Sequence, residues 1–223
     1  TTDKCYKNKN SLYGYRETDR LGGKDPYSAS KAACEFLINS YSKSFFNEID
    51  SANIASARAG NVIGGGDWGK YRIIPDCIRA FEKNKPIVIR NPDSTRPWQH
   101  VLEPLSGYLK LGMALVKQGK KYQGSWNFGP YNNCTTSVQN LVKAFMREMN
   151  KGKIELRPDK DEVKEAKFLA LDISKAKDKL KWEPKLNFLE MVKLTAEEYQ
   201  INNLNSVQVY QQRLDHIKYY SSL

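Results

Sequence analysis

Apolar side chains recur at helical spacing in several stretches of the chain. The longest predicted helix starts at residue 26 and reaches about residue 49. Asp25 can cap it, and Pro26 fits its first turn because the N–H that proline lacks would have no intrahelical partner there. The apolar side of this helix consists of Ala29, Ala33, Phe36, Leu37, Tyr41 and Phe45.

The same spacing predicts further helices over residues 75–83, 101–118 and 138–149, the last entered through Thr136 and Ser137. Asn187 and Glu190 have the spacing of a capping box that opens a helix reaching about residue 199. Beyond residue 200 the pattern predicts a polar helical tail.

Short apolar or β-branched runs predict strands between these helices. They cover residues 1–6, 54–58, 86–90, 126–128, 154–157 and 168–171, and a glycine-rich loop is expected from residue 60 to about 72. Strands that alternate with helices favour an α/β fold built on a parallel sheet.

Composition narrows the class of protein. Of 223 residues, 40% are hydrophobic and 27% charged, which is typical of a folded globular chain, and no apolar run approaches the ~20 residues of a membrane span. Cysteines at 5, 34, 77 and 134 and two distant histidines have no metal-ligand spacing. We expect no metal site, no disulfide frame, no membrane association and a cytoplasmic location.

The net charge of +11 attracts polyanions, which include nucleic acid and diphosphate-bearing small molecules. The basic residues are spread over predicted helix faces and loops, without an arginine-rich arm or a nucleic-acid motif. We therefore expect no nucleic-acid partner. A pyrophosphate-linked substrate accounts for the positive charge without an extended nucleic-acid-binding surface.

Two pairs of side chains are candidates for chemistry. Tyr27 and Lys31 lie four residues apart on one helix face, where an ammonium favours the phenolate and makes the tyrosine a usable base. Asp3 and Lys4 place a carboxyl beside an amine directly after the hydroxyl of Thr2. Taken singly, each pair is more often an ordinary surface pair than a catalytic one.

The order of several motifs is more specific than any one of them. The chain resembles the NAD-dependent sugar-nucleotide dehydratases of the extended short-chain dehydrogenase/reductase superfamily, over about the C-terminal two-thirds of such an enzyme. The matching stretches are residues 2–6, 14–17, 25–31, 57–68, 90–92, 96–104 and 127–130.

The resemblance implies part of a Rossmann-type parallel sheet interwoven with a smaller α/β substrate-binding lobe. Residues 1–63, with the strand near 125–128 and the helix at 101–118, would be the remainder of an NAD-binding domain. Residues 64–200 would form mainly the substrate lobe, and residues 201–223 a helical tail.

Residues 64–69 fit the dinucleotide motif G-x-G-x-x-G literally, but no helix is predicted to begin within them, so we reject this assignment. In the family the cofactor glycines lie upstream of the first residue here. We therefore expect an incomplete NAD site, and a chain that is inactive and poorly stable by itself. Full-length members are expected to be homodimers.

The implied reaction is the dehydration of a nucleoside-diphosphate glucose to its 4-keto-6-deoxy form by internal hydride transfer. Tyr27 would remove the C4 hydroxyl proton, with Lys31 and Thr2 assisting, and Asp3 would protonate the departing C6 hydroxyl. Lys4 would be either the base at C5 or an electrostatic stabiliser of the enolate. A lysine at this position points within the family to members that act on CDP-glucose.

Further contacts follow from the same resemblance. Ala59 and Gly60 would pass close to the nicotinamide, and Tyr27 and Lys31 would also bind the cofactor. The substrate would be held by Asn61, by Arg72 and Arg96 as partners of the diphosphate, and by Asn127 as a donor to a phosphate. We read His100 as structural, and Glu103 as structural and capping the helix that starts beside it.

Two kinds of alternative remain open. A sugar-nucleotide epimerase or reductase would use Tyr27 and Lys31 but has little need of the Asp3–Lys4 pair. A non-catalytic module that binds sugar nucleotides, or a basic nucleic-acid-binding module, would need neither pair.

Overall fold

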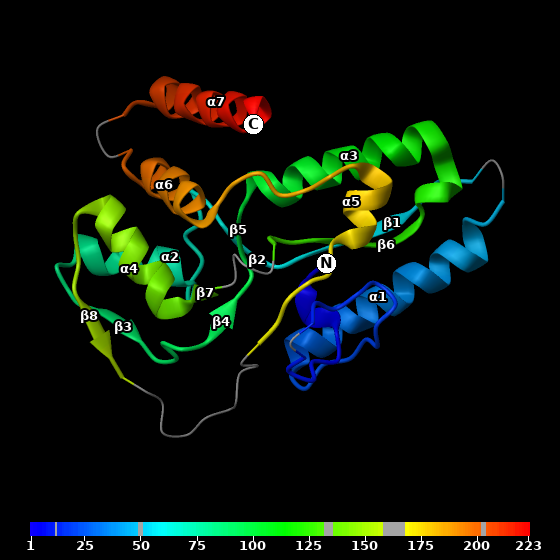
Figure 1. The fold of residues 1–223 in the computed structure, drawn as a ribbon, viewed down its shortest axis with the longest axis horizontal. Coiled ribbons are helices and arrows are strands. Elements are labelled where there is room, and N and C mark those ends of the chain that lie inside the picture. Colours follow the sequence, from blue (N-terminus) through cyan, green and yellow to red (C-terminus); the bar gives the residue numbers. More distant parts are fainter. Residues whose placement is uncertain (12, 49–50, 132–135, 158–167, 202–203) are drawn as a thin grey trace.

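The computed structural model describes residues 1–11, 13–48, 51–131, 136–157, 168–201 and 204–223. Figure 1 shows two groups of elements side by side, joined by the strands in the middle of the picture. Strands paired in parallel alternate with helices, so the predicted α/β class is confirmed. Cys134 lies outside the described residues.

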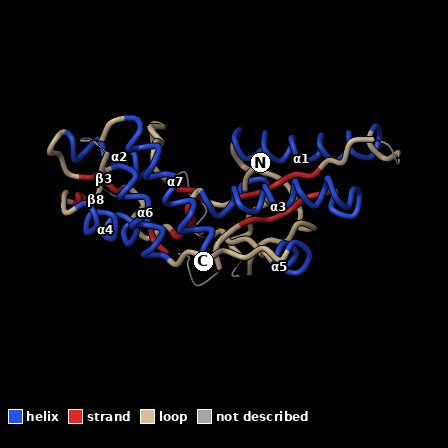
Figure 2. Tube along the Cα trace, turned by 90° about the horizontal axis from the view of Figure 1, so that it is seen from above, coloured by secondary structure: helices blue, strands red, loops and turns tan. Residues whose placement is uncertain are grey.

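The first group is built on two parallel strands, β1 (Ala55–Ala59) and β6 (Gly124–Phe128). The helix α1 (Pro26–Phe45) lies on one side of this pair and α3 (Leu102–Gln118) on the other in Figure 1, and the view in Figure 2 shows both helices running along the strands. The short helix α5 (Ser174–Leu180) packs against β6 and α3. Trp126, Phe128 and Trp182 are buried at the centre of this core.

The second group has its own core. The parallel strands β3 (Ile87–Ile89) and β8 (Ile154–Leu156) lie beside α2 (Ile73–Glu82), α4 (Val138–Met149) and α6 (Phe188–Tyr199). Ser137 caps α4, and Asn187 and Glu190 form the predicted capping box of α6. The apolar stripe of α4 faces this core, where Leu141, Val142 and Phe145 are fully buried.

Short strands link the two groups. Parallel β2 (Asn61–Ile63) and β5 (Trp98–His100) lie between them, and antiparallel β4 (Thr95–Arg96) pairs with β7 (Thr136–Ser137). Because β2 follows β1 after one residue and β5 leads into α3, the chain crosses between the groups.

The C-terminal tail is helical, as predicted, over α7 (Ser206–Ser222). Its Tyr220 donates a hydrogen bond of 2.7 Å to Glu103 on α3, and Lys185 and Leu186 donate their backbone N–H groups to the same carboxylate. The predicted role of Glu103 as a cap of α3 is therefore wrong: this buried carboxylate ties the tail and the 185–186 segment to α3.

Several predicted elements differ from the structure. Residues 3–5 form a 3₁₀ turn, η1 (Asp3–Cys5), flanked by single bridges at Thr2 and Tyr6, because Thr2 caps the turn through the Lys4 N–H. The loop predicted from residue 60 contains β2, and the strand predicted at 168–171 is reduced to one bridge at Leu171. In the described residues no helix is long and apolar enough to cross a membrane.

Candidate active site

The turn η1 gathers the first group of predicted site residues. Thr2 donates a hydrogen bond of 3.0 Å from its hydroxyl to Asp3 Oδ1, and Lys4 Nζ lies 3.5 Å from the same oxygen. Lys4 Nζ also donates to Asn61 Oδ1 at 3.3 Å. Thr2, Asp3, Lys4 and Asn61 therefore form one connected cluster at the start of β2.

The Asp3 carboxyl is almost completely buried, at 1% exposure. Burial raises its pKa, and the neighbouring Lys4 and Thr2 oppose this shift without cancelling it. Its second oxygen, Oδ2, is buried and has no hydrogen-bond partner among the described residues. Such a carboxyl favours its protonated form more than an exposed aspartate does and has an unused atom for a further contact.

The second pair of candidate residues lies on the first turns of α1. Asp25 and Ser28 form the capping box of this helix, and the hydrogen bonds from Ser28 lower the pKa of Asp25. Lys31 Nζ lies 5.7 Å from the centre of the Tyr27 ring, so the predicted neighbours share one face. Tyr27 is half exposed.

The two groups belong to elements that pack against each other. The turn η1 contacts α1, and Gly22, in the loop that leads into α1, donates its N–H to Cys5 O at 2.9 Å. Within the described residues, however, no hydrogen bond or ion pair links Asp3 or Lys4 to Tyr27 or Lys31. That all four act on one substrate remains a prediction.

The end of β1 provides the backbone beside this cluster. Ala59 is buried and pairs with Thr2 in a parallel bridge. At Gly60 a Cβ atom would lie 3.1 Å from Pro97, so a side chain there would require Pro97 to move. Packing against Pro97 therefore favours glycine at position 60, between Ala59 and Asn61. The family resemblance predicts that the nicotinamide lies at this position.

The two arginines predicted to bind the diphosphate differ in their burial and their partners. Arg96 is buried on β4 and donates to Thr95 O at 2.7 Å, and its charge is the weakest of those that oppose the effect of burial on the pKa of Asp3. Arg72 precedes α2, is largely exposed and forms an ion pair of 2.9 Å with Asp67. A phosphate contact of Arg72 would have to compete with this pair.

Asn127 is fully buried on β6, and both N–H donors of its side chain are already used. Its Oδ1 accepts from Tyr6 OH at 2.7 Å, and its Nδ2 donates to the carbonyls of Tyr15 and Asp172 at 2.8 and 3.1 Å. These bonds tie the loop after η1 to β6. The predicted phosphate contact of Asn127 would require breaking one of them.

Sequence reasoning missed a buried ion pair next to the site. Arg58 Nη2 lies 2.6 Å from Glu35 Oε2, with both side chains almost fully buried, and Arg58 Nη1 donates to Tyr6 OH at 2.8 Å. The signal was present, because Ser28, Ala32 and Glu35 share one helix face and Ser56 and Arg58 share one face of β1. This network fixes α1 to β1.

A second network was also missed. His216 on α7 lies between Glu197 Oε2, at 3.0 Å, and Glu198 Oε1, at 3.4 Å, while His100 Nε2 lies 3.6 Å from Glu198 Oε2. Gly65 donates its backbone N–H to the same Glu198 carboxylate. The loop between Asn61 and Arg72 is thereby attached to α6 and α7.

Comparison with known proteins defines the class. Residues 1–195 match the model of the GDP-mannose 4,6 dehydratase family, and the chain belongs to this family. Solved structures with the same fold include a dTDP-glucose 4,6-dehydratase from Bacillus anthracis in complex with NAD, at a TM-score of 0.72 and 21% identity, covering 91% of this chain and 60% of that one. A UDP-glucuronic acid 4-epimerase from Bacillus cereus gives 0.71 and 19%, covering 89% and 59%.

Within the family, the chain is 45% identical to the CDP-glucose 4,6-dehydratase of Salmonella typhimurium over 194 residues, or 85% of this chain and 54% of that protein. It is 24% identical to a dTDP-glucose 4,6-dehydratase of Xanthomonas campestris over 218 residues, 91% of this chain and 57% of that protein. The chain therefore spans little more than half the length of these relatives, less than the two-thirds expected.

Proposed function

We propose that this chain supplies the proton-transfer and sugar-binding residues of a dehydratase that converts CDP-glucose to CDP-4-keto-6-deoxyglucose. The observation that carries the proposal is the cluster of Thr2, Asp3, Lys4 and Asn61, in which a buried carboxyl with a raised pKa lies beside an ammonium. The identity to the Salmonella enzyme supports CDP-glucose as the substrate.

The residues present fit one end of an NAD molecule. Tyr27, which is half exposed, and Lys31 share one helix face, and β1 ends at Ala59 and is followed by Gly60, so no bulky side chain lies at this end of the strand. The glycine loop at 64–69 does not fit the pyrophosphate, because α2 begins only at Ile73. The nicotinamide half is therefore the part that this chain would hold. When bound, NAD would supply a hydride acceptor at C4 and, in its reduced form, a hydride donor at C6.

The side chains divide the proton transfers between them. The Tyr27 phenolate takes the proton of the C4 hydroxyl, and the Lys31 ammonium stabilises the phenolate charge. Once C4 is a ketone, the hydrogen on C5 becomes acidic and passes as a proton to a base. Asp3 then donates its proton to the departing C6 hydroxyl, a role that requires the raised pKa that burial causes.

Lys4 has two possible roles in this scheme. As the base it would take the C5 proton, which requires a neutral amine; as an ammonium it would stabilise the enolate oxygen. Its contacts with Asp3 and Asn61 place it in the cluster for either role. Both roles predict that removing its charge and basicity suppresses enolisation at C5.

An exchange experiment tests the proposal without hydride transfer. The 4-keto product, incubated with the chain in D₂O, should exchange its C5 hydrogen for deuterium faster than in buffer, as followed by proton NMR. Lys4→Met should remove this acceleration, while Lys24→Met, an exposed lysine near α1, should retain it. An epimerase has no need of this exchange. The exchange requires no hydride transfer and hence no complete NAD site, so a rate equal to buffer, from a chain that circular dichroism shows to be folded, would contradict the dehydratase proposal.

A binding experiment tests the rival of another class. CDP-glucose binding, measured by calorimetry, should persist at moderate salt, and the chain should not be retained on immobilised DNA. A DNA affinity that falls steeply with salt would instead favour the nucleic-acid-binding module. For the whole protein we propose a homodimer in the cytoplasm.

A further inference from the structure

A cavity of about 680 Å³ lies between residues 7–11, 13–20, 130–131 and 171–177, and none of the residues of the Asp3–Lys4 cluster lines it. Five of its lining side chains are cationic: Lys7, Lys9, Arg16, Arg20 and Lys177. Only two are carboxylates, Asp19 and Asp172. We call it the basic cavity.

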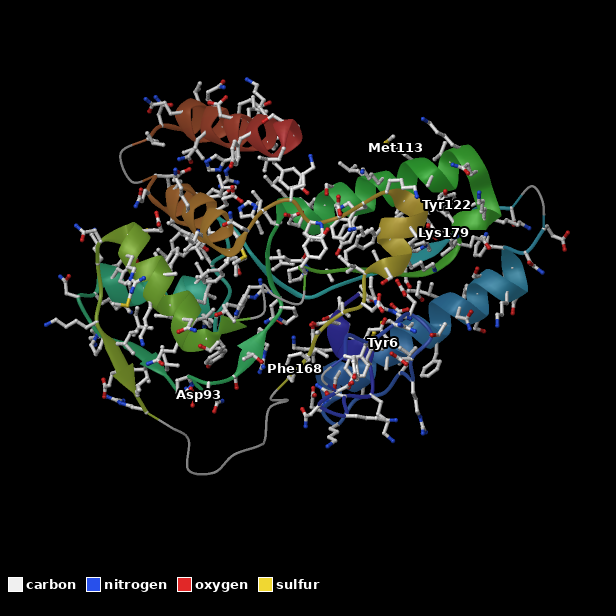
Figure 3. All side chains as sticks on the ribbon, in the orientation of Figure 1. Tyr6, Asp93, Met113, Tyr122, Phe168 and Lys179 are labelled. Carbon is white, nitrogen blue, oxygen red and sulfur yellow. The ribbon has the colours of Figure 1, made fainter. Side chains whose placement is uncertain are left out.

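The walls of the basic cavity are held by defined contacts. Tyr15 donates its N–H to Ala170 O, and Asp172 donates its N–H to Tyr15 O, both at 2.9 Å. A Cβ at Gly14 would lie 2.6 Å from the backbone of Leu171, so only glycine permits this approach. Asn8 donates to Phe168 O at 3.1 Å, and Figure 3 shows Phe168 beside the N-terminal loop. The loop is thus fastened to the 168–172 segment at Asn8 and at residues 14–16.

The carboxylates in the wall pair with only part of the cations of the basic cavity. Asp172 Oδ2 pairs with Arg16 Nε at 2.9 Å, and Asp19 Oδ2 accepts the backbone N–H of Arg16 at 2.7 Å. Lys177 pairs with Glu183 at 2.9 Å. Among the described residues, no ion pair engages the side chains of the other three cations, Lys7, Lys9 and Arg20.

Two of these three cations are held side by side. Tyr6 and Leu21 form an antiparallel bridge, and Lys7 donates its N–H to Arg20 O at 2.8 Å, so the backbones of Lys7 and Arg20 are direct neighbours. Lys9 is anchored two residues further on by the bond of its N–H to Tyr15 OH at 2.6 Å. Concave surroundings focus the field of such unmatched charges and favour a compact polyanion.

The rim of the basic cavity carries aromatic rings. Tyr13 is 83% exposed and Tyr131 is 38% exposed, with the Lys177 ammonium 5.4 Å from the centre of the Tyr131 ring. Flat rings beside cations suit a nucleobase attached to phosphates. The volume lies in the range of small-molecule sites and is too small for a nucleic-acid duplex.

From the charge, shape and rim together, we propose that the basic cavity is a second anion site, which binds a nucleoside polyphosphate. Lys7, Lys9 and Arg20 contact the phosphates, where the arginine fork can engage two oxygens at once. Tyr13 contacts the base. The site does not depend on the dehydratase proposal, because none of its residues belongs to the Asp3–Lys4 cluster.

Titration calorimetry with the 223-residue chain tests this site, with CTP and tripolyphosphate as probes. Both should bind, and CTP more tightly. The double variant Lys7→Gln/Arg20→Gln should weaken the binding of both by roughly tenfold or more, the expected cost of losing charge-assisted hydrogen bonds. The control Lys83→Gln/Lys85→Gln removes the same charge from exposed positions after α2 and should leave the affinity within about twofold.

Each other result decides against the proposal. Equal weakening in the two double variants would mean that only net charge matters. Equal affinity for CTP and tripolyphosphate, or CTP binding that is unchanged in Tyr13→Ala, would show that the cavity does not bind the nucleobase. Binding lost in Asn61→Ala, or displaced by CDP-glucose, would place the polyphosphate at the Asp3–Lys4 cluster. Circular dichroism of each variant separates a lost site from a lost fold.

Discussion

The helices α1 and α4 both have an apolar side, which is more sharply defined on α4, yet the two sides are used in opposite ways. On α4 the stripe is the core, with Leu141, Val142 and Phe145 fully buried. On α1 the stripe faces outward, with Phe36 59% and Phe45 66% exposed. A periodic pattern shows that a helix has an apolar side; it does not show which part of the structure covers that side.

The difference lies in what each helix packs against. α4 contacts α6 and α2, which carry matching apolar faces. α1 contacts β1 and η1 through the face formed by Ser28, Ala32 and Glu35, and the Glu35–Arg58 pair is the centre of this contact. Among the described residues, no element covers the apolar side of α1. The same substitution should therefore change the free energy of unfolding much more in α4 than in α1.

The largest difference is expected for one phenylalanine in each helix. Phe145→Ala leaves a cavity in the core and should lower the free energy of unfolding by about 3–5 kcal/mol. Phe36→Ala removes an exposed ring and should change it by no more than about 0.5 kcal/mol. Urea unfolding followed by circular dichroism measures both, and similar losses would show that the α1 stripe is covered.

The polar contact of α1 should be nearly as sensitive as the apolar core of α4. Burial raises the pKa of Glu35, but hydrogen bonds from Arg58, Thr1 and Ser56 outweigh it and leave the pKa below its ordinary value. Glu35→Gln leaves the buried Arg58 charge unpaired and should cost about 3 kcal/mol. Glu48→Gln, an exposed glutamate after α1, serves as the control, and a cost below about 1 kcal/mol for Glu35→Gln would contradict this account.

These helices also show how far the sequence alone could lead. Caps and periodicity predicted α1, α4 and α6 to within a few residues, because these signals are local. Periodicity could not predict that α1 turns its polar side inward, because that depends on Arg58, which is distant in sequence. The strands β4 and β7 were missed because two residues are too few to show a period, and β5 (Trp98–His100) was missed because it lacks the β-branched residues that mark β3.

The candidate site divides in the same way. The motif residues 2–4 predicted the Asp3–Lys4 pair, and its contact with Asn61 follows from the bridge between Thr2 and Ala59. The sequence could not show that both N–H donors of the Asn127 side chain are used, because the partners Tyr15 and Asp172 come from two separate loops. Motifs identify candidate residues, whereas tertiary contacts decide which of their atoms remain available.

A smaller, pH-dependent effect should distinguish the α6–α7 contact from both helices. The bonds to Glu198 and Glu197 raise the pKa of His216, although burial opposes this. Burial raises the pKa of Glu198, but the bonds from His100, His216 and Gly65 outweigh it and hold the pKa well below its ordinary value. The histidine contribution is thus complete below its unfolded pKa of about 6.5 and is lost as the pH rises through the folded pKa. The glutamate contribution is present above about 4.5 and is lost as the pH falls through its folded pKa.

His216→Gln should therefore cost about 1–2 kcal/mol near pH 5.5 and much less near pH 9. The cost is read from urea unfolding of both proteins at the two pH values. Asp215→Asn, an exposed neighbour on α7, should show no such dependence. A cost for His216→Gln that is the same at both pH values would mean that packing, and not the charged pair, attaches α7.

The smallest effect on stability, and the most direct test of the exposed stripe, is expected from Leu37→Glu on α1. Leu37 is 59% exposed, so the substitution should change the free energy of unfolding by no more than about 0.5 kcal/mol. It should nevertheless reduce concentration-dependent self-association in sedimentation velocity, because a charge interrupts a continuous apolar surface. Leu189→Glu, at the similarly exposed start of α6, lacks such a surface and should leave self-association unchanged. If Leu37→Glu instead cost more than about 2 kcal/mol, the stripe would be buried in solution and α1 would resemble α4.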